Sequence, residues 1–210
     1  MVAAGLGEND ARRPPDHRVL ETVTLLLELG SDAAAATPSG QTALHGAASM
    51  WEDEVIQLLV DHGADPQITT VEGTTPLAVA AGIGYNEGTR QAPDEQVLEA
   101  IRLAIASGND PNLSNKHGQT PLHGAVYRGL EPAIQLLVDE GASMDAVDAV
   151  GRTPLKLAEE GYFLLASRLR RDEVAVLLAR LGNDTTEAAR LRRLNPTPGS
   201  GATRGTAASR

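Results

Sequence analysis

The chain contains no cysteine among its 210 residues, which excludes disulfide bonds, thiolate metal sites and cysteine nucleophiles. Aromatic residues make up only 2% of the chain, although 41% of all residues are hydrophobic. A single-cored globule of this size normally uses more large rings to fill its centre. A core built from Ala, Leu and Val therefore indicates thin layers, with helix packed closely on helix.

Positive charge is also scarce, because 18 Lys and Arg residues face 28 Asp and Glu residues, a net charge of −10. Affinity for nucleic-acid phosphates depends on clustered Lys and Arg, so no nucleic-acid partner is predicted. The exception is an arginine-rich stretch between Arg168 and Arg193. Glu173 and Glu187 interrupt it, and the pattern favours a solvated helix face over a nucleic-acid patch.

Long apolar runs are missing, and none approaches the ~20 residues that a membrane-spanning helix needs. The first residues show no basic segment followed by an apolar one, so no signal peptide is visible. We therefore expect no membrane partner and, by default, a cytoplasmic location. The first unit described below begins part-way through its pattern, which suggests that the natural protein extends upstream. In that case the location is unknown.

What the chain does contain is a repeat. A Gly-x-Thr-x-Leu pattern occurs four times, and successive glycines are 33, 45 and 33 residues apart. The pattern opens at Gly40, Gly73, Gly118 and Gly151. After each opening comes a second apolar segment and then a glycine-containing break. Short and long units therefore alternate.

Each opening predicts the start of a helix, because Thr is a favourable N-cap and Pro is tolerated at the first helical position. The residues with this predicted structural role are Thr42, Thr75, Pro76, Thr120, Pro121, Thr153 and Pro154. The second segment carries apolar residues at helical spacing, such as Val55, Ile56, Leu58 and Leu59. One such helix pair cannot bury its apolar face alone, but several stacked pairs can.

Gly-x-Thr-Pro-Leu-His at the head of a 33-residue helix–turn–helix, with Gly-Ala-Asp near its end, resembles the ankyrin repeat family. The resemblance extends from about Met1 to Asn183. It implies an all-α solenoid of about five stacked helix–turn–helix units with short hairpin-like turns. It also implies a non-enzymatic scaffold that binds another protein through its concave face and projecting turns, with no cofactor and as a monomer. The alternative is an accessory ankyrin segment of a larger protein, secreted or enzymatic, that is truncated at its N-terminus.

The expected units follow the openings. They are a partial unit with an insert (1–39), a repeat (40–72), a repeat with an insert of about twelve residues (73–117), a repeat (118–150), a last repeat with a capping helix (151–195) and a disordered tail (196–210). The inserted stretches have two interpretations. They either cover an edge of the stack or form a ridge of Tyr85, Asn86 and Arg90 that a ligand contacts.

His45 and His123 occupy the same repeat position, where Ala78 and Lys156 stand in the other units. The family resemblance implies that each imidazole bonds backbone groups of the adjoining turn. A metal or catalytic pair would need the rings close together, but two stacked units at ~10 Å per helix layer separate them by roughly 20 Å. We therefore predict no metal site and no catalytic residue. A metal-dependent hydrolase, the remaining alternative, predicts bound metal in the purified protein.

Trp51 stands where the other short unit has Gly129, at the end of the first helix. It either lines the concave face, where Trp, Tyr and Arg are typical of binding hot spots, or packs onto the insert of the next unit. The resemblance implies a partner-binding set drawn from this position and the projecting turns. Its members are Gln41, Ser49, Met50, Trp51, His117, Gln119, Tyr127 and Arg128.

Overall fold

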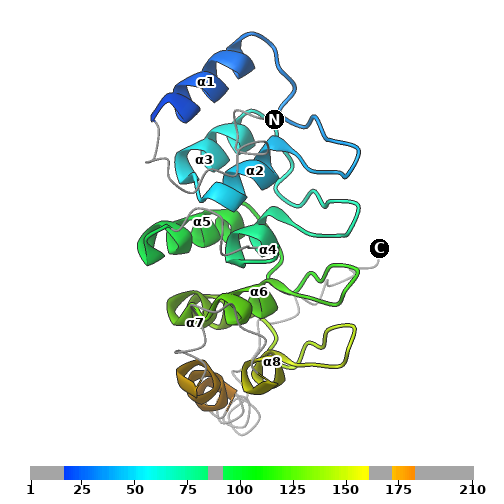
Figure 1. Ribbon diagram of the computed structural model, residues 1–210. Helices are drawn as coiled ribbons and strands as arrows, with labels where there is room; N and C mark the ends of the chain where they lie inside the picture. Colours follow the sequence, from blue (N-terminus) through cyan, green and yellow to red (C-terminus); the bar gives the residue numbers. More distant parts are fainter. Residues whose placement is uncertain (1–16, 85–91, 161–171, 183–210) are drawn as a thin grey trace, which may run out of the picture.

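The computed structural model describes residues 17–84, 92–160 and 172–182 (Figure 1). The described residues form short helices joined by turns. The helices are α1 (His17–Glu28), α2 (Ala43–Met50), α3 (Asp53–Asp61), α4 (Pro76–Ala81), α5 (Asp94–Ala106), α6 (Pro121–Arg128), α7 (Glu131–Asp139) and α8 (Pro154–Glu160), followed by helical residues 172–182. Within the described residues the only β-type pairing outside a helix is one isolated antiparallel bridge between Ala36 and Thr42.

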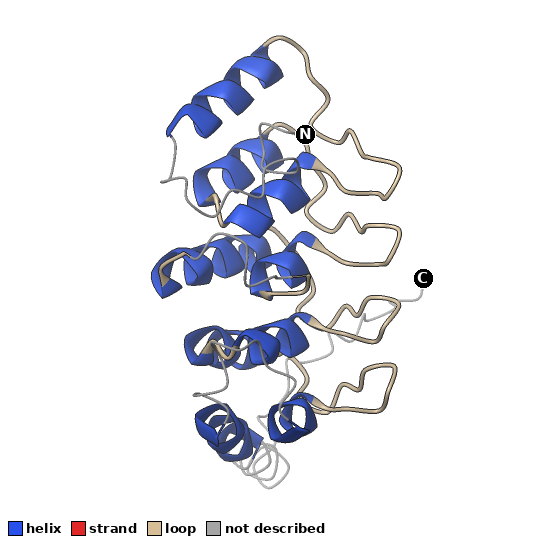
Figure 2. Cartoon of the chain, viewed as in Figure 1, coloured by secondary structure: helices blue, strands red, loops and turns tan. Residues whose placement is uncertain are grey.

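The helices stack in two columns (Figure 1). The first-helix column consists of α2, α4, α6 and α8, and the second-helix column contains α1, α3, α5 and α7. Helices α2, α4 and α6 each also pack against the second helix that follows in the chain, α3, α5 and α7 respectively. Figure 2 shows the connecting turns projecting from one side of this stack. The all-α stack of paired helices is the architecture that the sequence predicts.

A line of alanines explains how closely the first helices approach. One alanine lies three residues after the Leu of each Gly-x-Thr-x-Leu pattern, and its side chain is completely buried. These residues are Ala47, Ala80, Ala125 and Ala158, each with 0% of its surface exposed. A larger side chain here would separate the layers, because protein interiors are close-packed.

The second helices supply the larger core residues, with one correction to the predicted stripe. Val55, Ile56 and Leu59 are buried in α3, whereas Leu58 is only half-buried. In α7, Leu137 is buried and Leu136 is half-buried in the same way. The stripe is narrower than predicted because the outer side of the second-helix column has no further layer of helices over it in the described part of the chain.

The four projecting turns share one hydrogen-bond pattern. The first residue of each turn donates its backbone N–H to the carbonyl four residues later, and its side-chain oxygen accepts the N–H of that same residue. The first residues are Thr37, Thr70, Asn115 and Asp148, and the side-chain bonds measure 2.9 to 3.1 Å. The fourth residue is the Gly of the repeat, with φ between 69° and 79°, the left-handed region that glycine enters without steric cost.

Of the described helices, none is both long enough and apolar enough to cross a membrane.

Candidate partner-binding surfaces

The two motif histidines form matching caps on α2 and α6. The Nδ1 atom of His45 accepts the backbone N–H of Thr42 at 3.2 Å, and Nδ1 of His123 accepts the backbone N–H of Thr120 at 3.2 Å. The other ring nitrogen reaches the next unit. Nε2 of His45 lies 3.0 Å from the carbonyl oxygen of Thr74, and Nε2 of His123 lies 3.1 Å from that of Arg152. Each imidazole thus caps its own helix and links two units.

This geometry fixes the protonation state of both rings. A carbonyl oxygen only accepts, so Nε2 must carry a proton, and Nδ1 is then the acceptor of a neutral ring. Burial lowers the pKa of His45 and of His123 below the ordinary histidine value, more than their hydrogen bonds to backbone carbonyls raise it. Because both nitrogens of each ring are already engaged, neither ring offers a lone pair to a metal ion.

Where the repeat lacks histidine, the Thr side chain alone caps the start of the helix. The hydroxyl of Thr75 accepts the N–H of Ala78 at 3.1 Å, and the hydroxyl of Thr153 accepts the N–H of Lys156 at 3.2 Å. Pro76, Pro121 and Pro154 each occupy the first position of their helix, where a missing N–H leaves no bond unmade.

Of the two interpretations of Trp51, the structure agrees with packing against the next unit and corrects the placement of this residue in the partner-binding set. The side chain is buried, with 1% of its surface exposed, at the turn between α2 and α3. Its indole N–H donates to the carbonyl of Ala80 at 2.9 Å, and the side chain of Gln96 donates to the Trp51 carbonyl at 2.9 Å. Trp51 therefore packs against the next unit, next to both ends of its inserted stretch. The physical reason is that the large apolar ring gains more from this interior position than from exposure to water.

Of the predicted set, the structure brings Trp51 and Arg128 together. The guanidinium carbon of Arg128 lies 4.6 Å from the centroid of the indole ring, a cation–π distance. The Arg128 stem crosses Gly82 on the way, since a Cβ added to Gly82 would lie 2.6 Å from Cδ of Arg128. The pair is an internal contact across three units, so it leaves little of Trp51 for a partner.

The remaining predicted residues fall into two places. Ser49, Met50 and Tyr127 are half-buried near the ends of α2 and α6, and the Ser49 hydroxyl donates to the carbonyl of Gly46 at 2.7 Å. Gln41, His117 and Gln119 lie on the projecting turns, where Gln41 and His117 are exposed and Gln119 is half-buried. Tyr85, Asn86 and Arg90 of the predicted ridge lie outside the described residues, as do the predicted capping helix and tail.

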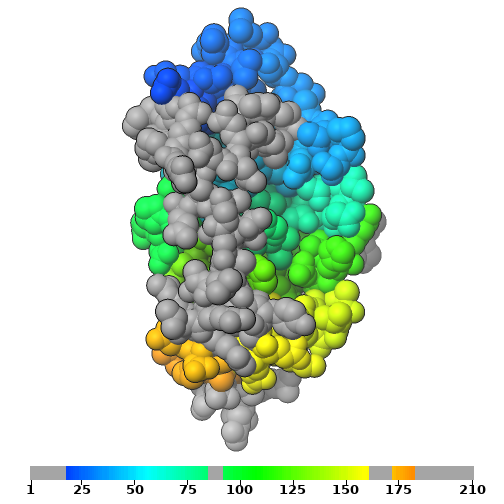
Figure 3. Space-filling view, in the orientation of Figure 1, coloured from blue at the N-terminus to red at the C-terminus, as the bar shows by residue number. Residues whose placement is uncertain are grey.

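A row of exposed side chains runs across the tips of the turns, and we call it the tip surface. Its members are Ser39, Val71, Glu72, Lys116, His117 and Val150. Val71 and Val150 are 54% and 69% exposed, so they add apolar area to a row of otherwise polar side chains. Glu72 and His117 approach to 3.8 Å across neighbouring turns. Figure 3 shows the turns following one another along one edge of the molecule.

Main-chain hydrogen bonds hold these tips together. The N–H of Val71 donates to the carbonyl of Ser39 at 2.9 Å, that of Lys116 to Glu72 at 2.9 Å, and that of Ala149 to His117 at 2.7 Å. At Gly40 close approach is a second reason for glycine, besides its left-handed φ, because a Cβ there would lie 2.8 Å from the backbone nitrogen of Val71. The tip surface is therefore a preformed row held together by backbone bonds.

Sequence reasoning missed two features of these surfaces. The exposed valines have no motif to mark them. The first residues of the turns differ in type, but Thr37, Thr70, Asn115 and Asp148 all stand three residues before a repeat glycine and all carry a short side chain with an oxygen. That shared position is a pattern that could have identified them.

At Asp148, burial alone would raise the pKa, but hydrogen bonds from Arg152 and Val150 and the charge of Arg152 hold it below the ordinary value.

Comparison with known families agrees with this geometry. A family model described as ankyrin repeats (3 copies) matches residues 16–91 and again residues 90–186. These matches cover most of the chain, so the protein belongs to the ankyrin repeat family. Proteins of this family generally mediate protein–protein interactions, and the repeats themselves are typically not catalytic. A search of curated proteins found none that matches.

Proposed function

We propose that the chain is a non-enzymatic scaffold that, as a monomer, binds a partner protein through the tip surface and the half-buried residues at the ends of α2 and α6. The backbone hydrogen bonds that join each turn to the next are the observation that carries this proposal. Because backbone bonds of 2.7 to 2.9 Å already order the tips, binding needs little further ordering of the loops.

The chemistry of the tip surface supports a protein partner. Val71 and Val150 offer apolar contacts, and Glu72 and Lys116 offer charges of both signs within the same row. This mixture of apolar area and interspersed polar groups is typical of protein interfaces. His117, Gln41 and Gln119 of the predicted set belong to the same turns and are retained in the proposal. Ser49, Met50 and Tyr127 remain predicted contacts, and Trp51 is withdrawn as a surface anchor.

A partner found by affinity capture and mass spectrometry from the native host can test the proposal, once the purified partner is titrated by calorimetry. The tip variant carries Val71→Ser, His117→Ser and Val150→Ser. These side chains are exposed, so each change should alter the free energy of unfolding by less than about 0.5 kcal/mol. A matched control, the α7 variant, carries Glu131→Gln, Asp139→Asn and Glu140→Gln on the second-helix column.

We expect the tip variant to weaken partner binding by about tenfold or more, and the α7 variant to bind as the wild type does. Circular dichroism melts of all three proteins check that folding is unchanged. A partner that binds the tip variant with wild-type affinity would refute the assignment of this surface.

A further inference from the structure

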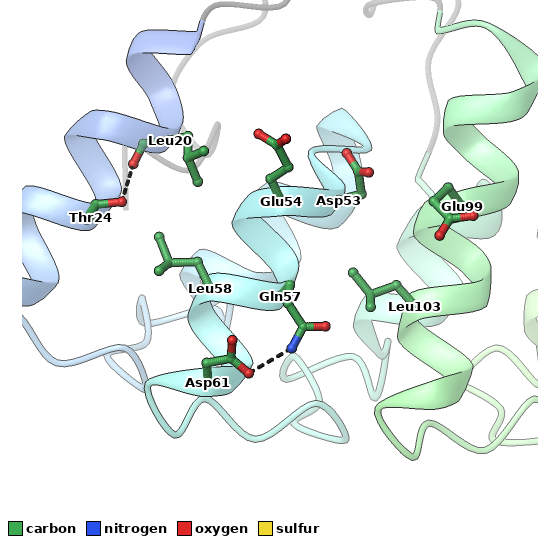
Figure 4. Close-up of a pocket in the computed structure, with 9 residues that line it drawn as sticks. All are labelled: Leu20, Thr24, Asp53, Glu54, Gln57, Leu58, Asp61, Glu99 and Leu103. Atoms are coloured by element: carbon green, nitrogen blue, oxygen red, sulfur yellow. Dashed lines mark hydrogen bonds between the residues drawn. The ribbon is translucent and has the colours of Figure 1, made fainter.

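A second surface lies on the other side of the stack, in the second-helix column. Helices α1, α3 and α5 line an open groove with a volume of about 560 Å³ (Figure 4). Its lining comes from all three helices: Leu20, Thr24, Asp53, Glu54, Gln57, Leu58, Asp61, Glu99 and Leu103. None of these residues belongs to the tip surface, so the groove is independent of the function proposed above.

The floor of the groove is apolar. Leu20 of α1, Leu58 of α3 and Leu103 of α5 are each half-buried, with one side packed against the core and the other open to the groove. Leu58 is the residue of the predicted core stripe that the fold leaves half-buried. Three leucines from three different helices thus provide separate apolar contact points within one depression.

The walls are acidic. Asp53, Glu54, Asp61 and Glu99 contribute four carboxylates, and none of the lining residues that the structure describes is Lys, Arg or His. Arg102 of α5, which neighbours the lining residues Glu99 and Leu103, is engaged on its own helix, where its guanidinium lies 3.4 Å from Glu99 and 3.6 Å from Glu95. The side chain of Gln57 donates to Asp61 at 2.7 Å, which orients that carboxylate (Figure 4).

We propose that this groove binds a basic amphipathic helix of a partner protein. Apolar side chains of such a helix, spaced by three or four residues, would contact Leu20, Leu58 and Leu103, as in other helix-in-groove complexes. Lys or Arg residues on its flanks would meet the carboxylates. Glu54 and Asp61 are seven residues apart on α3, about 10.5 Å along the helix, so basic residues two turns apart on the bound helix match their spacing.

The volume fits this occupant. At about 560 Å³ the groove accommodates several aliphatic side chains from one face of a helix, while the rest of the helix stays outside. The net charge of −10 further favours approach of a cationic segment, because long-range attraction raises the association rate.

The probe for the test is a fluorescein-labelled peptide of about 14 residues, roughly four helical turns, with Leu at helical spacing and Lys elsewhere. A peptide of the same composition in scrambled order is the control for non-specific attraction. The groove variant carries Asp53→Asn, Glu54→Gln and Asp61→Asn. The α7 variant defined above is its match, since α3 and α7 share the sequence Ile-Gln-Leu-Leu-Val-Asp and each variant removes three negative charges.

Fluorescence anisotropy should show the probe binding the wild type, the tip variant and the α7 variant with similar affinity. The groove variant should bind about tenfold more weakly, and raising the salt from about 50 mM to about 500 mM should weaken wild-type binding. Leu58→Ala should also weaken binding, whereas Leu136→Ala at the matching position of α7 should not. Thermal melts of each variant separate loss of the site from loss of the fold.

Three results would overturn the proposal. The groove and α7 variants could weaken binding equally, which would make the attraction a general effect of charge. The scrambled peptide could bind as tightly as the probe. The protein alone could form a dimer in sedimentation that the groove variant abolishes, which would assign the groove to a second copy of the chain. The tip variant should lose binding of the partner protein but still bind the probe peptide. That result shows that the groove and the tip surface can be tested independently of each other.

Discussion

The helix pairs α2–α3 and α6–α7 carry closely similar sequences, but the residue that ends the first helix differs. Trp51 follows α2 with φ of 52°, and Gly129 follows α6 with φ of 68°. Both are left-handed, a conformation that costs a non-glycine residue about 1–2 kcal/mol. The comparison shows that one backbone geometry can be met in two ways, by a residue with no steric cost or by a large residue whose burial offsets that cost.

The neighbouring units explain why the two pairs differ. Helix α4, which packs on α2, ends at Ala81 after six residues, and the Arg128 side chain passes over the following Gly82 to reach the indole ring. Trp51 therefore has an apolar site and an acceptor, the Ala80 carbonyl, supplied by the unit with the insert. The difference between the helix pairs α2–α3 and α6–α7 therefore follows from the neighbouring unit that packs on each pair.

The largest expected effect comes from removing the indole ring. Trp51→Ala should lower the free energy of unfolding by about 3–5 kcal/mol, because a fully buried ring and its hydrogen bond are lost. Urea denaturation followed by circular dichroism measures this. Trp51→Gly is the informative companion: relief of the left-handed strain should make it more stable than Trp51→Ala by about 1 kcal/mol, although its side chain is smaller. If the Trp51→Ala protein had wild-type stability but failed to bind its partner, Trp51 would be a partner-binding residue and not a buried structural one.

A second prediction tests what the two helix pairs share. Leu59→Ala in α3 and Leu137→Ala in α7 should each cost about 2–5 kcal/mol through cavity formation, since both side chains are buried. Leu58→Ala and Leu136→Ala should cost clearly less, because these neighbours are half-buried. Denaturant titration of the four variants compares them directly. Equal losses at all four positions would mean that the second helices are covered on both sides.

The repeat architecture was predictable because local backbone chemistry dictates its markers. Glycine is needed where the turn has φ near 70°, and Thr stands where a helix begins. Both constraints act within a few residues, so they appear as motifs in the sequence. The roles of His45 and His123 followed from the same local pattern together with the family resemblance.

Local pattern left two alternatives open for Trp51, of which burial against the next unit was one, and it gave no sign of the groove. Whether Trp51 is buried depends on Gly82 and Arg128, which belong to other units and carry no motif that refers to Trp51. The groove depends on how α1 lies against α3, a packing geometry that a periodic sequence does not encode. Leu58 and Leu136 have the same sequence environment, yet only a three-dimensional arrangement decides what lies beside each.

The third prediction concerns Gly129, the left-handed residue after α6, and introduces a side chain at that position. Gly129→Ala should cost about 1–2 kcal/mol, because the second helix pair then places a Cβ in the left-handed region without the compensating burial of an indole ring. Thermal unfolding of this variant beside Trp51→Gly isolates the conformational cost. The idea fails if Gly129→Ala is as stable as the wild type, since the left-handed position would then carry no penalty.

The smallest effect for a single residue concerns the histidine caps, in which the two helix pairs are alike. Because burial lowers the pKa of His45 and His123 in the folded protein, the unfolded chain binds protons more readily below its ordinary histidine value of 6.5. Stability contributed by the neutral rings is therefore complete above that value and falls as the pH drops below it toward the folded-state pKa. At about pH 5.5 the loss should stay below about 1.4 kcal/mol for each histidine. Urea midpoints between about pH 7.5 and pH 5.5 measure it, and the double variant His45→Gln, His123→Gln should show a flatter profile from a lower starting stability. An unchanged slope in that variant would assign the pH dependence to other groups, and unequal slopes in the two single variants would show that the caps differ after all.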